Sequence, residues 1–432
     1  MIELLKSVLQ ECNVTTYKIV EEKVESAELF FIKKDVDLSR GKDVINYTLT
    51  VYKDFEEKGK RYRGASEVTI FRTMKKEEIK VIVNTAMYAA NFIKNEYYDL
   101  PKGNKEDNIV IPNGFSSNTI EDAAFIIKDM LYNKDVFEKG FINSSEIFVY
   151  KVNKRIVNSE GIDVSYEKIY SDVEFITQWI ENQDVELYNC ISFTELNKDY
   201  IDDKVIRALK KTKFREKAKD KLPSGKYNVI LCEDEVRELI AGYYVNGAKT
   251  SSIYNKTSNF KINEKLQGEG IKGDYLNISL KAFLSNSKTS APYDNDGIKL
   301  NDLDLISNGV LKNYYGNNRF CQYLNIEPTG DIPNVIVKCG NKSMGDMEKE
   351  IGLLVLAFSS FEMDELTGDF AGEIRLGLYN NGEKITPITG GSISANIKDV
   401  QDKLYLSSDI YKTTSYEGPI AVQICDVSVA GE

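Results

Sequence analysis

Two acidic runs hold the residues in this sequence with the greatest capacity for chemistry. The first spans residues 232–238 and contains Glu233, Asp234, Glu235 and Glu238, and the second spans residues 362–369. Neighbouring carboxylates can bind a hard cation or act as a general acid and base. The first run equally suits the first turn of a helix, where the macrodipole favours acids, and the second suits a solvent-facing loop. The structural interpretation is the simpler one for both runs.

The chain contains no histidine among its 432 residues. This absence excludes Ser-His-Asp triads, Cys-His dyads and zinc sites built on histidine. The six cysteines stand singly, without a C-x-x-C pair, so we expect reduced, mostly buried thiols. Cys232 lacks an imidazole base and is a poor candidate for a nucleophile. We expect no metal and no other cofactor.

Two further segments resemble binding motifs only in part. Residues 268–273 are rich in glycine but match neither phosphate-loop pattern, so we expect a flexible loop. Residues 210–221 hold the only concentration of lysine and arginine in the chain. Acidic residues interrupt it and no aromatic ladder accompanies it, so we interpret it as a solvated helix face.

Composition and charge limit the class of protein. Lys and Arg number 56 against 67 Asp and Glu, which gives a formal net charge of −11, and 42% of the residues are hydrophobic. Such a chain folds, but its acidic balance argues against binding duplex nucleic acid. The N-terminal residues resemble no signal peptide, and no apolar run is long enough to cross a membrane. We therefore expect a cytoplasmic protein without membrane or nucleic-acid partners.

The helices and strands that the sequence predicts indicate an α+β fold with two domains, at residues 1–221 and 222–432. These elements position the candidate reactive residues. Helical spacing of apolar residues predicts helices over 2–10, 75–96, 119–132 and 201–219. Ser117 or Asn118 is the expected cap of the third helix. Alternating runs predict a hairpin within residues 44–71 and two strands that flank a turn at 157–161.

From about residue 226 strands dominate, and we expect a domain rich in antiparallel strands. Runs of β-branched residues lie at 334–339, 351–358, 374–379 and 420–424. Residues 380–383 (NNGE) predict a tight hairpin turn. In the last strand the apolar residues change parity between Ile424 and Val427, which predicts a bulge near Cys425 and Asp426.

An ordered series of short motifs, one in the middle segment and the others in the C-terminal half, resembles the TldD/PmbA family, also known under the name modulator of DNA gyrase. The motifs are residues 157–161 (VNSEG), 291–297 (APYDNDG), 305–311 (LISNGVL), 352–355 (GLLV), 364–371 (DELTGDFA), 381–387, 393–397 (ISANI) and 427–431 (VSVAG). Their order across about 280 residues carries the resemblance, whereas the first 150 residues fit only in general character.

The resemblance implies an intracellular metallopeptidase system in which a TldD-type subunit binds zinc through a His-Glu-x-x-x-His helix and a cysteine near its C-terminus. A PmbA/TldE-type partner lacks that site. In this chain the first histidine position corresponds to Arg237 or Glu238 and the second to Gly242 or Tyr243. Residues 412–419 contain no cysteine, and Cys425 lies in the last predicted strand. The sequence is therefore closest to the PmbA/TldE type.

The resemblance leads to one main hypothesis for function and one alternative. The main hypothesis is a non-catalytic subunit that forms part of a chamber for unfolded or leader peptides, paired with itself or with a zinc-bearing TldD-type subunit. Strand addition is the expected binding mode. The alternative is an active metallopeptidase that uses a relocated carboxylate site among Glu233, Asp234, Glu235 and Glu238. The cleft residues that the resemblance suggests are Arg237, Glu238, Tyr243, Tyr293, Asn308 and Gly309.

Overall fold

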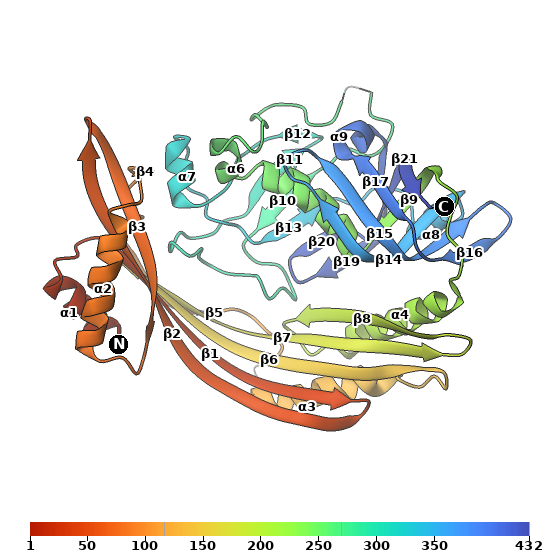
Figure 1. The fold of residues 1–432 in the computed structure, drawn as a ribbon, viewed down its shortest axis with the longest axis horizontal. Coiled ribbons are helices and arrows are strands. Elements are labelled where there is room, and N and C mark those ends of the chain that lie inside the picture. The colour runs from red at the N-terminus through yellow and green to blue at the C-terminus, as the bar shows by residue number, and fades with distance from the viewer. Residues whose placement is uncertain (116, 269, 432) are drawn as a thin grey trace.

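The structure is a computed structural model that describes residues 1–115, 117–268 and 270–431. Within these ranges three β-sheets are accompanied by helices, and strands dominate the second half, which confirms the predicted α+β class. A long curved sheet built by the first half lies beside the more compact second half (Figure 1). No described helix is both long and apolar enough to cross a membrane.

The first sheet has eight described strands in the order β4-β3-β2-β1-β6-β7-β5, with β8 paired to β7. Its strands are β1 (Tyr17–Ile32), β2 (Asp35–Glu57), β3 (Lys60–Phe71), β4 (Asn95–Glu96), β5 (Asn104–Val110), β6 (Gly140–Asn158), β7 (Ile162–Ile180) and β8 (Asp184–Phe193). The predicted hairpin is the β2–β3 pair, and the predicted turn at 157–161 joins β6 to β7. Both predictions are confirmed.

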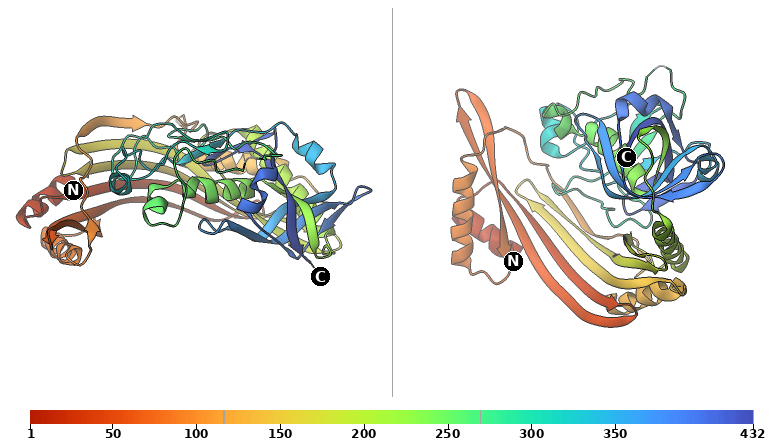
Figure 2. Two further views of the ribbon diagram at one scale, coloured as in Figure 1. Left: turned by 90° about the horizontal axis from the view of Figure 1, so that it is seen from above. Right: turned by 45° about the vertical axis from the view of Figure 1, so that its right-hand side comes forward.

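Helices pack against this sheet at its two ends (Figure 2). They are α1 (Ile2–Glu11) and α2 (Lys76–Ala90) at one end and α3 (Ile120–Leu131) and α4 (Lys198–Lys217) at the other. Alternate strand residues such as Ala27, Leu29 and Phe31 are buried against α3 and α4, as a period of two requires. Thr119, rather than Ser117 or Asn118, caps α3. The predicted helix 75–96 ends early, because β4 pairs with β3 instead.

The second half contains two sheets. One comprises β9 (Gly225–Cys232), β14 (Gly352–Met363), β15 (Asp369–Asn380), β16 (Ile385–Ile388), β17 (Ser392–Asn396), β18 (Leu404–Leu406) and β21 (Ala421–Ala430). The other comprises β10 (Ile278–Lys281), β11 (Leu303–Ser307), β12 (Val310–Leu311), β13 (Asn334–Val337), β19 (Ile410–Thr413) and β20 (Tyr416–Pro419). In the first of these, β14, β9, β21, β17 and β15 pair in a closed ring, because β15 also pairs with β14. This ring forms a small barrel.

Short helices connect the strands of the second half. They are α5 (Asp234–Ile240), the π-helix η2 (Ala241–Val245), α6 (Thr250–Tyr254), α7 (Asn318–Tyr323), α8 (Met344–Glu348) and α9 (Ile397–Val400), and single 3-10 turns η1 (Tyr132–Lys134) and η3 (Gln401–Lys403) follow α3 and α9. The hairpin turn at 380–383 joins β15 to β16, and the register of β21 shifts between Ile424 and Val427. The predicted hairpin turn and bulge are both confirmed.

One hydrophobic core links the barrel to the long sheet. Ile156, Ile162 and Val164 of the long sheet belong to the same buried cluster as Val229 of β9 and Leu353 of β14. A shared core holds the two halves in a fixed relation, and that relation places α4 and β8 opposite the start of α5. The domain boundary between residues 221 and 222 stays a prediction.

Candidate functional site

Glu233 occupies a sharp turn between a strand and a helix. β9 ends at Cys232 and α5 begins at Asp234, so Glu233 alone forms the connection, with φ 59° and ψ −121°. Its backbone N–H donates a hydrogen bond to the carbonyl oxygen of Ile420. A positive φ costs a residue other than glycine about 1–3 kcal/mol, and such strain persists only where surrounding contacts enforce it. The turn directs the Glu233 side chain away from the barrel and towards α4.

Glu233 forms a largely buried ion pair with Lys211 there. The ammonium group of Lys211 on α4 donates to the Glu233 carboxylate, and the two side chains are only 23% and 17% exposed. Burial alone disfavours both charges, but the attraction between them outweighs it. The pKa of Lys211 is therefore raised and the pKa of Glu233 is lowered. This pair connects the helix layer of the long sheet to the turn that begins α5.

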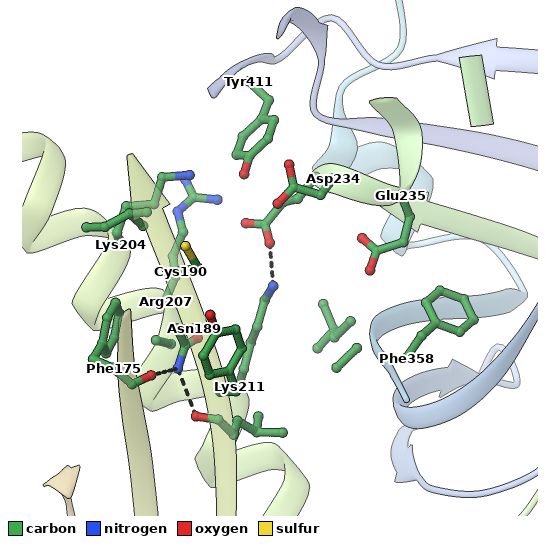
Figure 3. A pocket seen from close by; sticks show the side chains of 17 residues that line it. Phe175, Asn189, Cys190, Lys204, Arg207, Lys211, Asp234, Glu235, Phe358 and Tyr411 are labelled. Carbon is green, nitrogen blue, oxygen red and sulfur yellow. Dashed lines mark hydrogen bonds and ion pairs between the residues drawn. The ribbon is translucent and has the colours of Figure 1, made fainter. Parts of the chain in front are cut away.

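A cavity of about 300 Å³ surrounds this ion pair. One wall is formed by β8 and α4, and the opposite wall by the turn at Glu233, the first turn of α5 and residues 356–358 of β14. Tyr411 of β19 closes one end, and Figure 3 shows the carboxylates of Asp234 and Glu235 beside the Lys211 contact. With Phe175 of β7, residues from six segments of the chain therefore meet in one hollow.

Glu235 is the carboxylate in this cavity with the most perturbed acidity. Burial raises its pKa to about 7, and the neighbouring Asp234 and Glu233 add to the rise, although its own backbone N–H and Lys211 oppose it. Within the described residues no ion pair reaches Glu235. Such a group can exchange a proton near neutral pH. Cys190, the thiol in the cavity, has a pKa raised by burial, so the lining lacks an activated thiolate.

The other cations of the cavity wall already have partners. The Lys204 ammonium lies 4.1 Å from the ring centroid of Tyr411, and burial lowers its pKa. Arg207 donates to the Asp203 carboxylate over 2.8 Å. The interpretation of residues 210–221 as a solvated face therefore needs correction at Lys211, which binds Glu233. The sequence did not reveal this contact, because Glu233 lies 22 residues from Lys211 and a strand separates the two.

The cavity is bordered by two strand edges. β8 pairs with β7 on one side, and within the described ranges no strand pairs with its other side. β14 pairs with β9 only at Leu353 and Leu354. The two ends of β8 are anchored, since Arg375 donates to the Glu186 carbonyl over 3.1 Å and the Thr194 N–H donates to Asn286 over 2.7 Å. The central part of β8 thus presents an edge to the cavity.

The helix that would hold zinc in a TldD-type protein does not carry suitable donors here. Arg237 is a cation on α5, and Gly242 in the π-helix has no side chain. The ring of Tyr243 is buried against Phe260, with 5.4 Å between centroids. These residues do not fit a zinc ion.

The alternative of a carboxylate metal site also lacks a donor set. In the part of the chain that the structure describes, no group of three or more Cys, Asp or Glu side chains could hold a metal ion. Glu233 is engaged by Lys211, and the Glu238 carboxylate lies 3.9 Å from Arg237. The structure gives this alternative no support.

The six residues predicted for the cleft lie in three separate places. Arg237 and Glu238 lie on α5 and Tyr243 lies on η2, and none of the three lines the cavity. The buried Tyr293 hydroxyl donates to Glu106 of β5. Asn308 and Gly309 form the turn between β11 and β12. Tyr243 and Tyr293 both belong to the buried core that links the barrel to the long sheet. Of the cavity residues, Lys204 and Tyr411 carried no signal in the sequence, whereas Lys211 stood out only as part of the basic segment 210–221.

Other expectations for reactive segments have mixed outcomes. Asp364 in the second acidic run accepts hydrogen bonds from the N–H groups of Leu366 and Thr367 in an exposed turn, as expected for a loop. In segment 268–273, residue 269 lies outside the described residues. All six cysteines are unpaired, as predicted, but only Cys232 and Cys321 are buried. The expectation of mostly buried thiols is wrong.

Comparison with known proteins agrees with this architecture. Residues 224–431 match the family model described as PmbA/TldA metallopeptidase C-terminal domain. The Metalloprotease PmbA homolog of Buchnera aphidicola is 24% identical over 312 residues, which cover 66% of this chain and 69% of that protein. Metalloprotease PmbA of Escherichia coli O157:H7 is 26% identical over 217 residues, and this match spans less than half of either chain, at 49% and 47%.

Solved structures share the fold over the whole chain. TldE from Thermococcus kodakarensis superposes with a TM-score of 0.79 at 15% identity, over 99% of this chain and 100% of that one. A Thermotoga maritima protein whose name refers to modulation of a DNA gyrase superposes with a TM-score of 0.77 at 18% identity, over 99% and 100%. The family match over residues 224–431, together with the PmbA relatives, supports the assignment of this chain to the TldD/PmbA metallopeptidase family.

Proposed function

We propose that this chain is a non-catalytic, PmbA/TldE-like subunit that binds unfolded or leader peptides in the cytoplasm. It would act in proteolysis or peptide maturation beside a zinc-bearing TldD-type subunit, or form a homodimer. The observation that carries the proposal is the donor set on α5 and η2. Arg237, Glu238, Gly242 and Tyr243 replace the residues that a zinc helix needs, in a chain without histidine.

The cavity between α4, β8 and the start of α5, here called the junction cavity, supplies the surface that binds the peptide. The free edge of β8 offers backbone N–H and C=O groups to an extended chain, and such pairing places little demand on the sequence of the bound peptide. Side chains of alternate peptide residues would then enter the cavity between α4 and α5, as the period of a strand requires. The anchored ends of β8 hold this edge in place before a peptide arrives.

Three measurements on the purified protein test this function. Elemental analysis gives the metal content, incubation of an unstructured peptide with and without a chelator gives any cleavage, and a fluorophore on Cys190 reports binding. Cys190 lies on β8 and is the exposed cysteine of the six. We expect no stoichiometric metal, no cleavage, and a saturable change in emission when the peptide is added. A Cys190→Ser protein treated with the same reagent is the control for labelling elsewhere.

Each opposite result has a clear meaning. Stoichiometric metal with chelator-sensitive cleavage would overturn the non-catalytic assignment. Unchanged emission at Cys190, with no binding by calorimetry, would overturn the assignment of peptide binding to β8. Addition of a TldD-type subunit with a complete zinc helix should give cleavage that neither chain shows alone, if the two act as a pair.

A further inference from the structure

The charges that line the junction cavity leave one carboxylate without a counter-ion. Lys211 is paired with Glu233, Arg207 is tied to Asp203 outside the cavity, and Lys204 lies against the Tyr411 ring. Asp234 is 59% exposed to solvent, whereas Glu235 is only partly exposed. Among the described residues Glu235 therefore lacks the partner that burial of a charge demands.

Apolar groups of β14 lead to this carboxylate. Residues 356–358 of β14 form the wall beside Glu235, and Figure 3 shows the Glu235 carboxylate and the Phe358 ring on the same side of the cavity. An apolar wall that ends in an acid suits a ligand with an aliphatic stem and a cationic end, because the stem is buried while the charges meet. The Phe358 ring on this wall adds a favourable surface for a cation.

The geometry points to Glu235 as the residue that selects a cationic group, the ammonium or guanidinium of a bound peptide, in the junction cavity. This inference rests on the proposed peptide-binding function and adds its substrate class: extended peptides with a basic residue or a free N-terminus beside the β8 edge. The cation completes the ion pair that the protein itself leaves open, and its binding is accompanied by loss of any proton held on Glu235.

Calorimetric titration with matched peptides tests the inference. The probes are the peptide Thr-Val-Thr-Lys-Thr-Val-Thr with blocked termini, the same peptide with norleucine in place of lysine, and the norleucine peptide with a free N-terminus. We expect the lysine peptide to bind at least about tenfold more tightly than the blocked norleucine peptide, the range of a charged hydrogen bond. The third peptide shows whether an N-terminal ammonium serves as well as a side chain.

Glu235→Gln supplies the decisive comparison. We expect this variant to bind the lysine and norleucine peptides with equal affinity. The matched control is Glu121→Gln, because Glu121 is the second residue of α3 as Glu235 is the second residue of α5, and it is exposed. The control should keep the full preference for lysine.

The outcomes separate this inference from the proposed function. If the wild-type protein binds both blocked peptides equally, cation selection is overturned while peptide binding stands. If Glu235→Gln keeps the tenfold preference, Glu235 is not the selecting residue and the inference fails. If no peptide binds at all, the proposed function fails as well.

Discussion

Replacing Lys211 with methionine will lower the free energy of unfolding by about 3 kcal/mol. The reason is the buried position of its partner: without the ammonium group, the Glu233 carboxylate stays in the protein with no counter-ion. Glu233 cannot move away easily, because the strained turn and the hydrogen bond to Ile420 fix its backbone. Urea unfolding at pH 7, followed by circular dichroism, measures the change.

Two further variants show that the loss comes from the orphaned charge. Lys210→Met makes the same substitution one residue away at an exposed site and should change stability by less than about 0.5 kcal/mol. Adding Glu233→Gln to Lys211→Met should recover most of the lost stability, because neither partner then carries a buried charge. Equal stabilities of Lys211→Met and Lys210→Met would refute the role of the ion pair.

Glu235→Gln will make the protein more stable above neutral pH, by about 3 kcal/mol at pH 8. The pKa of Glu235 is raised from its ordinary value of 4.5 to about 7 in the folded protein, chiefly by burial. A shift of that size corresponds to about 1.4 kcal/mol for each pH unit between the two values. Glutamine keeps the shape and removes the buried charge.

The sign of this pH dependence follows from proton binding. Below pH 4.5 the carboxyl group is protonated in both states, so its contribution to stability is fully present. Between 4.5 and about 7 the unfolded chain releases the proton while the folded protein keeps it, and stability falls. Above about pH 7 both states have released the proton, and the contribution of Glu235 to stability is lost completely.

Urea unfolding of the wild-type protein and Glu235→Gln at pH 5 and pH 8 measures the difference. The charged groups that act on Glu235 are Lys211, Asp234 and Glu233, and they are present in both proteins. Glu121→Gln should leave the pH dependence unchanged. A stability difference between the wild-type protein and Glu235→Gln that is the same at both pH values would contradict the raised pKa.

Both predictions concern residues of the junction cavity, where two features lower the stability of the folded protein. Glu235 destabilises the folded protein at neutral pH, and a protein retains such a group where the charge has a use. The positive φ of Glu233 is a second feature that destabilises the folded protein in the same place. Strain at Glu233 and, two residues later, an acid with no ion-pair partner among the described residues mark the junction cavity as a site for a ligand, which is why the peptide experiments concentrate there.

Local patterns in the sequence were sufficient for many elements of the fold. The NNGE turn at 380–383 and the parity change before Val427 predicted a hairpin and a bulge, because backbone turns depend on neighbouring residues. Helix periodicity placed α1 and α3 to within a residue or two. The end of α2 was missed, since pairing of β4 with β3 overrides the helical pattern.

The sequence by itself determined that this chain has no histidine and no complete zinc helix, because donor chemistry is a property of residue type and spacing. The motifs of residues 157–431 likewise sufficed for the family. Only the tertiary structure decided that Lys211 meets Glu233, that Glu235 is partly buried with no ion-pair partner among the described residues, and that β8 presents an edge beside them. Burial and charge pairing depend on which distant segments meet, and no local pattern in the chain records that.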